Sequence, residues 1–448
     1  MQTFDLIVVG SGSAGKTVAE TVRKAGKTVA VIDKLPFGGT CSQRGCDPKK
    51  VLVGAAELIA RSQQLQGKGI TDMPRIDWPA LMAFKKTFTD PIPENTEQKF
   101  AEQGITALHG VARFTGPDSL RVGDTDLSAE RIVLATGARP QPLNIPGEAL
   151  LIDSTAFLEL PERPDELVLV GGGYIAFEFA HIAARAGARV TIVHRGERPL
   201  EGFDADLVKL LGRALAGIGI RIVLNADVTA IDGKPGALTV QYRQQGQTRT
   251  VAANVAVHAA GRVADVAELD LPRGNVAAGK KGIQVNEYLQ SRSNPVVYAC
   301  GDVAEKGLPL TPLAGYEGRL VAGNILHNNR QRFADDPVPT TVFTVPPLAS
   351  VGLTEEQARE QGQAVTVTFE ESTGWFSARR INEPAAGVKT LVDPETGRLV
   401  GAHLLGTGSD EVINLFALAM KHQLPAKALS EMLFAYPTHS SDMSYMLP

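Results

Sequence analysis

Two glycine-rich turns, each set between an apolar strand and a helix, constrain the fold of this 448-residue chain more than any other feature. In the first unit, the apolar run Phe4–Val9 leads into Gly-Ser-Gly-Ser-Ala-Gly over 10–15, and a second strand follows over Thr28–Ile32. The first glycine permits a tight turn, the second lets the backbone approach a pyrophosphate, and the third lets the helix pack on the strand. The pattern predicts a dinucleotide-binding βαβ unit with the phosphates at the helix N-terminus.

The end of the second strand supplies the other contacts of this unit. Asp33 follows Gly15 by 18 residues, where a carboxylate accepts hydrogen bonds from ribose hydroxyls. A lone GxGxxG also arises for purely steric reasons, but here both strands and the helix surround it. The dinucleotide contacts predicted in this unit are Gly10, Gly12, Ser13, Ala14, Gly15, Asp33 and Lys34.

A second unit of the same kind begins at Leu167, where three glycines over 171–173 open a helix and Arg189–Val193 forms the next strand. Two such units in one chain predict two dinucleotides. The contacts expected at the second turn are Gly171, Gly173, Tyr174 and Ile175.

The strand that closes the second unit ends in His194 and Arg195, with Arg198 shortly after and no acidic residue directly at its end. An NAD site normally uses a carboxylate there for the adenosine ribose, whereas a 2'-phosphate favours arginine. We therefore predict that His194, Arg195 and Arg198 contact NADPH, with NADH as a possible substitute. The alternative is that both arginines lie in solvent and bind nothing.

Two of the three cysteines, Cys41 and Cys46, lie five residues apart directly after a glycine pair. Five residues of regular helix advance about 7.5 Å, beyond the limit of about 7 Å between the Cα atoms of a disulfide. A bond therefore needs a distorted backbone, which Gly45 can supply, and Pro48 suits the first turn of a helix. The alternative is a pair of buried cysteines that never meet. Three cysteines favour a catalytic pair with Cys300 as a bystander in an apolar strand.

The run GGTCSQRGCDPKK over 38–50 resembles the GGTCxxxGCxPxK signature of the class I flavoprotein disulfide reductases, the family of glutathione reductase, lipoamide dehydrogenase and mercuric reductase. ATGARP over 135–140 resembles the family's crossover from the flavin domain to the pyridine-nucleotide domain, and AAGR over 259–262 resembles the return. The resemblance implies bound FAD and an α/β fold with two Rossmann-like dinucleotide-binding domains and an α+β C-terminal dimerisation domain.

The same resemblance implies a domain order. It gives an FAD-binding domain in two parts, 1–145 and 265–336, an NAD(P)H-binding domain over 146–264, and a dimerisation domain over 337–448. In the last, Thr354–Gln357 reads as a capping box, and Val388–Val392 with Leu399–Gly406 reads as a hairpin. We expect a homodimer whose active site takes residues from both chains.

Site roles also follow from the resemblance. It implies that Cys46 is the thiolate nearest the flavin, that Cys41 attacks the substrate, that Lys50 pairs with Glu178 beside flavin N5, and that Tyr174 covers the isoalloxazine. A lysine there stabilises negative charge, and a carboxylate keeps it protonated. The alternative for Lys50 and Glu178 is an ordinary surface pair. The remaining flavin contacts implied are Gly39, Thr40, Lys50, Ala135, Thr136, Gly137, Arg139, Gly261, Arg262, Gly301, Asp302, Leu310, Thr311 and Ala314.

The C-terminal segment departs from the family pattern. Thiol-reducing relatives carry a His-Pro-Thr segment and a glutamate, with the histidine as acid/base for the interchange thiol, whereas this chain has Tyr436 at the histidine position and a serine at the glutamate position. A phenol with a pKa near 10 moves protons to a thiol less readily than a histidine. Ordinary glutathione or lipoamide chemistry is therefore disfavoured. Either His439 and Asp442 compensate, or they are surface residues.

Composition excludes several classes of partner. A net charge of −4 with interspersed acids and bases leaves no basic stripe for nucleic acid. No apolar run is long enough to span a bilayer, and the N-terminus shows no secretory leader, so we expect a cytoplasmic protein without membrane contact. We predict no metal site.

The predicted function is an FAD-containing oxidoreductase that passes electrons from NADPH through a Cys41–Cys46 disulfide to an unidentified acceptor, a small molecule or small protein and preferably a disulfide. One alternative is a reductase of quinones, metal ions or oxygen that uses the cysteines as an electron store. A second alternative is a redox-inactive FAD-binding interaction protein.

Overall fold

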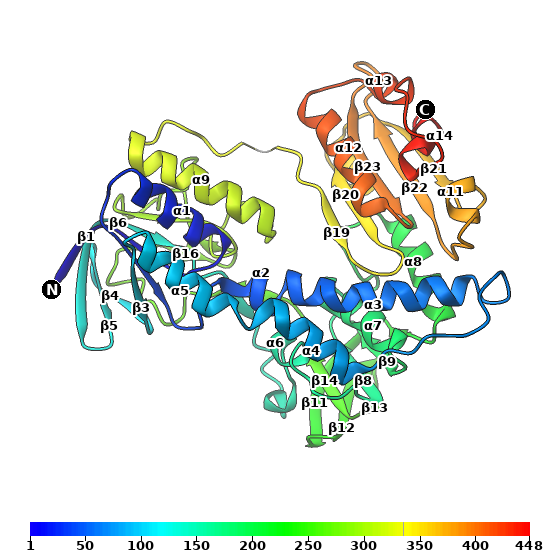
Figure 1. Cartoon of the computed structure of the whole chain (residues 1–448), viewed down its shortest axis with the longest axis horizontal. Coiled ribbons are helices and arrows are strands. Elements are labelled where there is room, and N and C mark those ends of the chain that lie inside the picture. The colour runs from blue at the N-terminus through cyan, green and yellow to red at the C-terminus, as the bar shows by residue number, and fades with distance from the viewer. Residues whose placement is uncertain (335) are drawn as a thin grey trace. The chain divides into compact units, whose positions relative to one another are not determined.

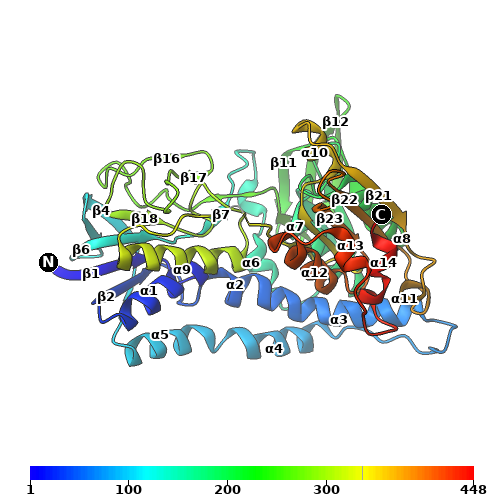
Figure 2. The same cartoon turned by 90° about the horizontal axis from the view of Figure 1, so that it is seen from above.

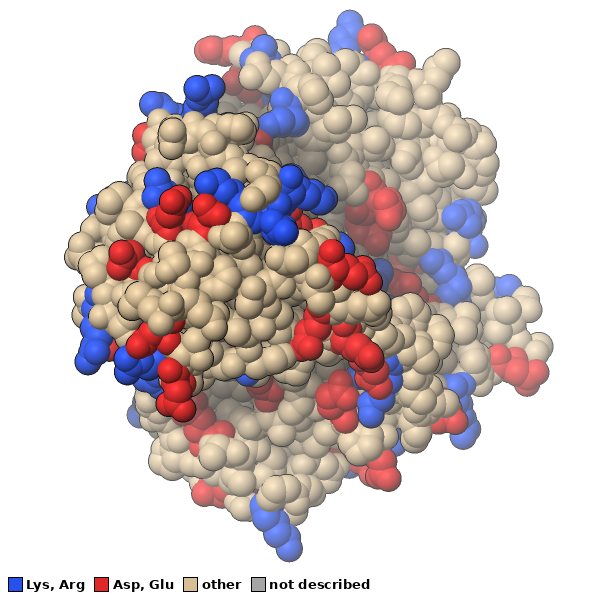
Figure 3. Space-filling model, turned by 60° about the vertical axis from the view of Figure 1, so that its left-hand side comes forward, with Lys and Arg blue, Asp and Glu red and all other residues tan. Residues whose placement is uncertain are grey.

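The computed structural model describes residues 1–334 and 336–448, which divide into two compact units. Unit 1 holds residues 1–49, 84–141 and 262–334, and unit 2 holds 50–83, 142–261 and 336–448. Figure 1 labels their elements, and the structure is of the mixed α/β class that the sequence predicts. On the face drawn in Figure 3, acidic and basic side chains are interspersed.

Unit 1 is built on a sheet of order β3-β2-β1-β6-β5-β4, with β18 also paired to β6. Strands β1 (Gln2–Val9), β2 (Val29–Asp33), β3 (Thr106–His109), β6 (Thr125–Leu134) and β18 (Val297–Ala299) pair in parallel. Strands β4 (Ala112–Gly116) and β5 (Ser119–Val122) add an antiparallel edge. The parallel strands are continuous apolar runs because both faces of such a sheet are covered, and Leu6, Ile7 and Val8 are fully buried.

The helices of unit 1 include a pair that packs beside this sheet. Helices α1 (Ser13–Lys24) and α9 (Thr311–His327) pack side by side in both views (Figures 1 and 2). The first glycine turn lies between the end of β1 and the start of α1, as predicted. Short strands β7 (Ala138–Pro140) and β15 (Arg262–Ala264) pair with each other, and β16 (Ala278–Gly279) pairs with β17 (Gly282–Ile283).

The cysteine segment forms two helices separated by Gly45. Helix α2 (Gly39–Arg44) precedes this glycine, and α3 (Cys46–Gln64) begins directly after it. Pro48 lies in the first turn of α3, as expected, where a helix needs no N–H donor. Helices α4 (Trp78–Thr89) and α5 (Ile92–Glu102) follow, and Pro91 lies between them as the N-cap of α5.

Unit 2 contains the second βαβ unit. A parallel sheet of order β10-β9-β8-β14 joins β8 (Glu166–Val170), β9 (Arg189–Val193), β10 (Arg221–Val223) and β14 (Val255–His258). Helix α7 (Tyr174–Arg185) follows the second glycine turn, and α8 (Ala205–Gly217) follows β9. An antiparallel sheet of β11 (Ala226–Lys234), β12 (Ala237–Gln244) and β13 (Gln247–Ala253) and the short helix α6 (Ser154–Phe157) complete this part.

The C-terminal part of unit 2 is an antiparallel sheet of order β19-β20-β23-β22-β21. Its strands are β19 (Thr340–Val342), β20 (Leu348–Gly352), β21 (Thr366–Glu371), β22 (Gly387–Val392) and β23 (Leu399–Leu405), with helices α10 (Glu355–Glu360), α11 (Phe376–Arg379), α12 (Ser409–Lys421), α13 (Ala426–Ser430) and α14 (Met443–Met446). The predicted hairpin and capping box are confirmed. Strand β20 begins at Leu348, directly after two prolines that cannot donate to a ladder. Among the described residues, no helix is long and apolar enough to cross a membrane.

Candidate active site

A cavity of about 250 Å³ opens in unit 1 at the carboxyl ends of the parallel strands. In doubly wound sheets this is the edge where dinucleotides bind. Val9, Ile32 and Ala135 mark the strand ends on its wall. The predicted site residues that line it are Gly10, Gly12, Ser13, Ala14, Asp33, Lys34, Gly39, Thr40, Cys41, Cys46, Ala135, Thr136, Gly137, Arg262, Gly301, Asp302, Thr311 and Ala314.

The first glycine turn fits a pyrophosphate sterically. Gly10 has φ +108°, and a Cβ there would lie 2.2 Å from the carbonyl oxygen of Ala135. A Cβ on Gly39 would come within 2.3 Å of the Gly12 Cα, so the loop before α2 packs directly on the turn. Gly15 does not line the cavity, because its Cα packs on the Gly10 carbonyl. Only glycines allow this close backbone cradle at the start of α1, and the cradle fits the FAD that the fold implies.

Asp33 is held rigidly at the cavity wall. Its carboxylate accepts hydrogen bonds from the backbone N–H of Ser11 at 2.8 Å, from the Ser11 hydroxyl at 2.6 Å and from the Leu35 N–H at 2.9 Å. Lys34 forms ion pairs with Asp265, at 3.0 Å, and with Glu268. The two acids, which the sequence analysis missed, also line the cavity and neutralise Lys34.

The two cysteines meet at the break between α2 and α3. Gly45 separates the helices with φ −142° and ψ −114°, and a Cβ there would lie only 3.0 Å from the Thr40 carbonyl oxygen. Both residues are present as thiols rather than as a disulfide. A hydrogen bond with Cys46 raises the pKa of the Cys41 thiol, and burial raises it further. The break at Gly45 thus brings together side chains that a continuous helix would hold apart.

Two polar side chains in unit 1 contact this thiol pair. The Cys46 Sγ lies 3.5 Å from the Thr311 hydroxyl, at the first residue of α9. The Cys41 Sγ lies 3.8 Å from Oδ1 of Asp47. The N-terminus of a 17-residue helix favours negative charge, whereas a carboxylate opposes it. The pair therefore has one neighbour that supports a thiolate and one that suppresses it.

The lysine expected beside the flavin is exposed, and its neighbour in sequence is buried. Lys50 lies 3.2 Å from Glu57 and 3.8 Å from Asp410, with its side chain 43% exposed. Lys49 is only 8% exposed. The GCxPxK spacing places the lysine of the signature at Lys50, whose Nζ also lies 4.3 Å from the centroid of the Phe343 ring. Glu178 is buried in α7 and accepts a hydrogen bond from the Phe343 N–H at 2.9 Å.

Glu317 is a second buried group that the sequence analysis missed. Its carboxylate is 1% exposed and accepts a hydrogen bond from the Gly301 N–H at 2.6 Å. Burial raises the pKa of Glu317 to about 7. Burial also raises the pKa of Asp302, which lines the cavity. Glu317 therefore fixes the turn that carries Asp302, a role that its position within a helix did not reveal.

Three further predicted flavin contacts do not line the cavity. Arg139 in β7 has its Nε 3.9 Å from Asp265, and Leu310 is the N-cap of α9. Gly261 directly precedes β15, with φ +112°. Cys300, expected to be inert, adjoins the cavity but is fully buried, and burial raises its pKa. Such a thiol is unreactive.

The second glycine turn in unit 2 is covered by the loop that follows β9. A Cβ on Gly172 would lie 2.6 Å from the His194 ring, and the Leu200 N–H donates to the Gly172 carbonyl at 2.8 Å. Gly171, with φ +126°, packs on Ala259, and Gly173 is the N-cap of α7, where Ile175 lies. The Tyr174 hydroxyl lies 2.7 Å from that of Thr340, and its ring packs edge-on against Phe203.

The two predicted phosphate-binding arginines differ in their surroundings. Arg195 is exposed and, within the described part of the chain, forms no ion pair. Arg198 forms a bidentate ion pair with Glu356, at 2.6 and 2.8 Å. His194 contacts the Arg198 carbonyl oxygen through Nε2 at 3.0 Å. Only Arg195 therefore offers an uncommitted cation at this turn.

The predicted C-terminal residues lie in unit 2, whereas the cysteines lie in unit 1. Tyr436 is 78% exposed and stacks on Phe376, with the ring centroids 6.5 Å apart. His439 packs against Gly408, and burial lowers its pKa. Asp442 is buried and accepts a hydrogen bond from the Ser377 hydroxyl. Asp442 is therefore not the surface residue that one alternative expected.

Comparison with known proteins agrees with this geometry. The sequence model of the family described as pyridine nucleotide-disulphide oxidoreductase matches residues 4–318, and that of its dimerisation domain matches 338–447, which supports a homodimer. The chain is 34% identical to a glutathione reductase of Burkholderia cepacia, over 97% of this chain and 96% of that protein. It is 30% identical to a mercuric reductase of Staphylococcus aureus, over 97% of this chain and 80% of the other.

The chain also resembles RclA of Escherichia coli, a probable pyridine nucleotide-disulfide oxidoreductase, with 32% identity over 99% and 98% of the two proteins. The solved structure of the Cu(II) complex of this HOCl-induced flavoprotein disulfide reductase matches with a TM-score of 0.89 at 31% identity, covering 100% of this chain and 99% of that one. The chain therefore belongs to the class I pyridine nucleotide-disulfide oxidoreductases, enzymes that use FAD and a pyridine nucleotide.

Proposed function

We propose that the enzyme passes electrons from NADPH through FAD and the Cys41–Cys46 pair to an external acceptor. The observation that carries this proposal is the contact of the two thiols on the wall of the cavity that the dinucleotide-binding turn lines. When bound beside this cysteine pair, FAD would supply hydride acceptance from the nicotinamide and two-electron reduction of the disulfide. A redox-inactive binding protein would need neither this contact nor the break at Gly45 that produces it.

The two cysteines have different roles in this proposal. Cys46 begins α3 beside Thr311, and we assign it to the flavin side of the pair, leaving Cys41 as the thiol that meets the acceptor. Reduction breaks the S–S bond and takes up two electrons and two protons, which leaves two thiols. An external disulfide takes the same two electrons and two protons back, whereas Cu(II) takes one electron for each ion.

We propose that Lys50, the lysine of the GCxPxK signature, stabilises negative charge on the flavin. Its Nζ lies 4.3 Å from the centroid of the Phe343 ring, and the Phe343 N–H donates to the buried Glu178. Glu178 is the carboxylate that we propose to keep this lysine protonated. Thr311 and the N-terminus of α9 would also favour negative charge.

The preferred coenzyme that we propose is NADPH, with Arg195 as the exposed contact for its 2'-phosphate. Tyr174, at the start of α7, is the side chain that would cover the flavin until nicotinamide arrives. We also propose a cytoplasmic location, because three cysteines in 448 residues do not form the disulfide framework of a secreted protein.

The acceptor class that we propose first is a disulfide, in keeping with the similarity to glutathione reductase. The second candidate is a metal ion, and two observations favour it. The RclA structure to which the chain is similar holds Cu(II). The Asp47 carboxylate beside Cys41 also attracts cationic acceptors and repels anionic ones. The exposed phenol of Tyr436, in place of a histidine, also disfavours the disulfide.

Steady-state turnover of the FAD-loaded dimer with NADPH tests the proposal. The acceptors would be glutathione disulfide, a neutral aromatic disulfide, Cu(II) and a quinone, each with wild type, Cys41→Ser and Cys46→Ser. The proposal predicts that at least one disulfide or Cu(II) is reduced and that both serine variants lose this activity. Turnover that both variants retain in full would show that the cysteines carry no electrons.

A further inference from the structure

Arg198 forms a bidentate ion pair with Glu356, an acid that lies 158 positions further along the chain in the same unit. Its two terminal guanidinium nitrogens donate to the two carboxylate oxygens of Glu356 at 2.6 and 2.8 Å, and its side chain is only 26% exposed. The hydrogen bond from Arg198 lowers the pKa of Glu356. Two parallel bonds of this kind satisfy the same donors that a phosphate would use.

The position of Arg198 connects this pair to the second dinucleotide turn. The loop after β9 folds over the turn through the Leu200 N–H, which donates to the Gly172 carbonyl at 2.8 Å, and through the His194 ring, which packs on Gly172. His194 in turn contacts the Arg198 carbonyl oxygen at 3.0 Å. Arg198 is therefore anchored where the adenosine end of a pyridine nucleotide is expected.

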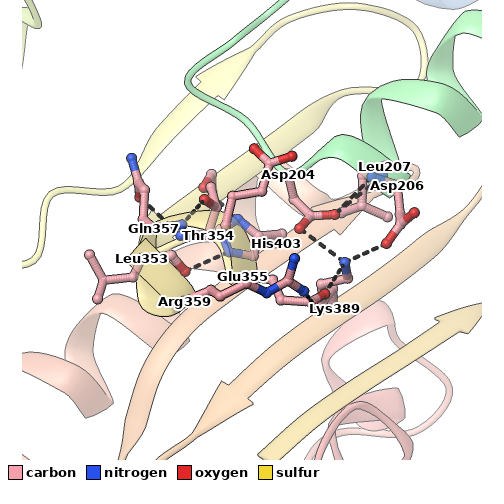
Figure 4. Close-up of polar contacts among 12 residues, drawn as sticks. Asp204, Asp206, Leu207, Leu353, Thr354, Glu355, Gln357, Arg359, Lys389 and His403 are labelled. Carbon is pink, nitrogen blue, oxygen red and sulfur yellow. Dashed lines mark hydrogen bonds and ion pairs between the residues drawn. The ribbon is translucent and has the colours of Figure 1, made fainter. Parts of the chain in front are cut away.

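Glu356 is held in place by the helix that carries it. Helix α10 begins with a capping box, in which Thr354 and Gln357 exchange hydrogen bonds at 3.0 and 3.2 Å. Glu355, which lies between Thr354 and Glu356, forms an ion pair at 2.9 Å with Lys389, whose side chain is 3% exposed. Figure 4 shows the Lys389 ammonium group among the carboxylates of Asp204, Asp206 and Glu355. The carboxylate of Glu356 therefore projects from a helical turn that hydrogen bonds and ion pairs hold in place.

We propose that Glu356 is a specificity-determining residue that competes with the coenzyme's 2'-phosphate for Arg198. This inference rests on the proposed coenzyme site. A 2'-phosphate can bind Arg198 only when the guanidinium leaves Glu356. NADH has no 2'-phosphate and therefore requires no such exchange. Arg195 then supplies the basal preference for NADPH, and Glu356 limits how strong that preference becomes. Loss of the carboxylate should increase it.

Calorimetric titration of the FAD-loaded dimer with adenosine 2',5'-bisphosphate and with 5'-AMP tests this inference without relying on turnover. In Glu356→Gln, the bisphosphate should bind about three- to tenfold more tightly, the scale of one half-exposed bidentate pair, while 5'-AMP affinity stays unchanged. Glu360→Gln is the matched control, because it removes the same charge from the same helix. It should change neither affinity.

A double substitution isolates the mechanism. Arg198→Ala combined with Glu356→Gln should abolish the gain, because no guanidinium remains to be released. A bisphosphate affinity that is unchanged or weaker in Glu356→Gln, an equal gain in Glu360→Gln, or a gain that survives Arg198→Ala would each overturn the inference. If wild type binds neither ligand, the coenzyme site itself is misplaced and the inference falls with it. Binding of 5'-AMP thus separates the two failures.

Discussion

The Sγ atom of Cys41 lies 3.8 Å from Oδ1 of Asp47, so a carboxylate contacts the thiol that is proposed to meet the acceptor. Hydrogen bonding with Cys46 and burial already raise the pKa of Cys41, and the negative charge of Asp47 raises it further. The reduced pair is therefore biased against a thiolate at Cys41. This bias supports the metal ion, the second acceptor class proposed above, because a neutral thiol is a poor nucleophile toward a disulfide.

Removal of the Asp47 charge should make Cys41 more reactive. Asp47→Asn is expected to raise the rate of Cys41 alkylation by iodoacetamide at pH 8 a few-fold, since the pKa of the thiol falls toward its usual range. Trypsin cleaves after Arg44, so Cys41 and Cys46 fall on separate peptides and mass spectrometry reads them independently. Asp124→Asn, a substitution of an exposed acid, is the control. An unchanged Cys41 rate would show that Asp47 does not govern the thiol.

The two adjacent lysines should differ in their effect on reduction of the cysteine pair. Lys50→Met is expected to slow the appearance of new thiols after NADPH addition by roughly tenfold or more, because the positive charge proposed to stabilise the reacting groups is lost. Lys49→Met is the matched control and should stay within about twofold of wild type, since Lys49 lies at the variable position of the signature. Rapid-quench thiol titration measures both. The reverse order would contradict the assignment of Lys50.

The tyrosine at the usual histidine position should limit glutathione disulfide turnover. Proton delivery to a leaving thiolate typically contributes about 10²- to 10⁴-fold, so we expect slow oxidation of the reduced enzyme by glutathione disulfide and a large gain in Tyr436→His. Reduction by NADPH should be equally fast in both, which stopped-flow measurement of the separate half-reactions can establish. His439→Ala tests whether His439 substitutes for the missing base. Fast glutathione disulfide reduction by wild type and by His439→Ala would refute this limit.

Glu317 should make the protein less stable as the pH rises. The folded pKa of about 7 lies above the ordinary value of 4.5, so between these values the unfolded chain loses a proton that the folded protein keeps. The carboxyl group therefore reduces the free energy of unfolding across that window, by at most about 3 kcal/mol. Glu317→Gln keeps the hydrogen bond from the Gly301 N–H but removes the ionisable group. The Tm of the variant minus the Tm of wild type should therefore be a few degrees larger at pH 8 than at pH 4.5. An equal Tm difference at both values would contradict this assignment.

The parts of the fold that the sequence predicts are those governed by local rules. The turns at Gly10 and Gly171 can be located because only glycine tolerates their backbone angles and close contacts. The Thr354 capping box and the β22–β23 hairpin depend on neighbouring residues alone. The start of a helix near Pro48 could likewise be expected, because the first turn of a helix tolerates a proline.

The parts of the site that the sequence could not predict depend on burial and on distant partners. The contacts of Lys50 with Asp410 and with the Phe343 ring join residues far apart in the sequence, so no local pattern shows them. The acid that binds Arg198 lies 158 positions away, and the carboxyl that holds Gly301 comes from the middle of a helix. Such contacts follow from tertiary packing, which a single sequence does not show.

The most direct test of the central claim counts thiols by peptide mass spectrometry in the air-oxidised, FAD-loaded enzyme before and after anaerobic addition of NADPH. The account predicts that two thiols per chain appear, one on the tryptic peptide that ends at Arg44 and one on the peptide that follows it. In Cys46→Ser, NADPH should produce no new thiol on the Cys41 peptide. If NADPH bleaches the flavin absorbance of wild type but no new thiol appears on either peptide, the Cys41–Cys46 pair is not part of the electron path.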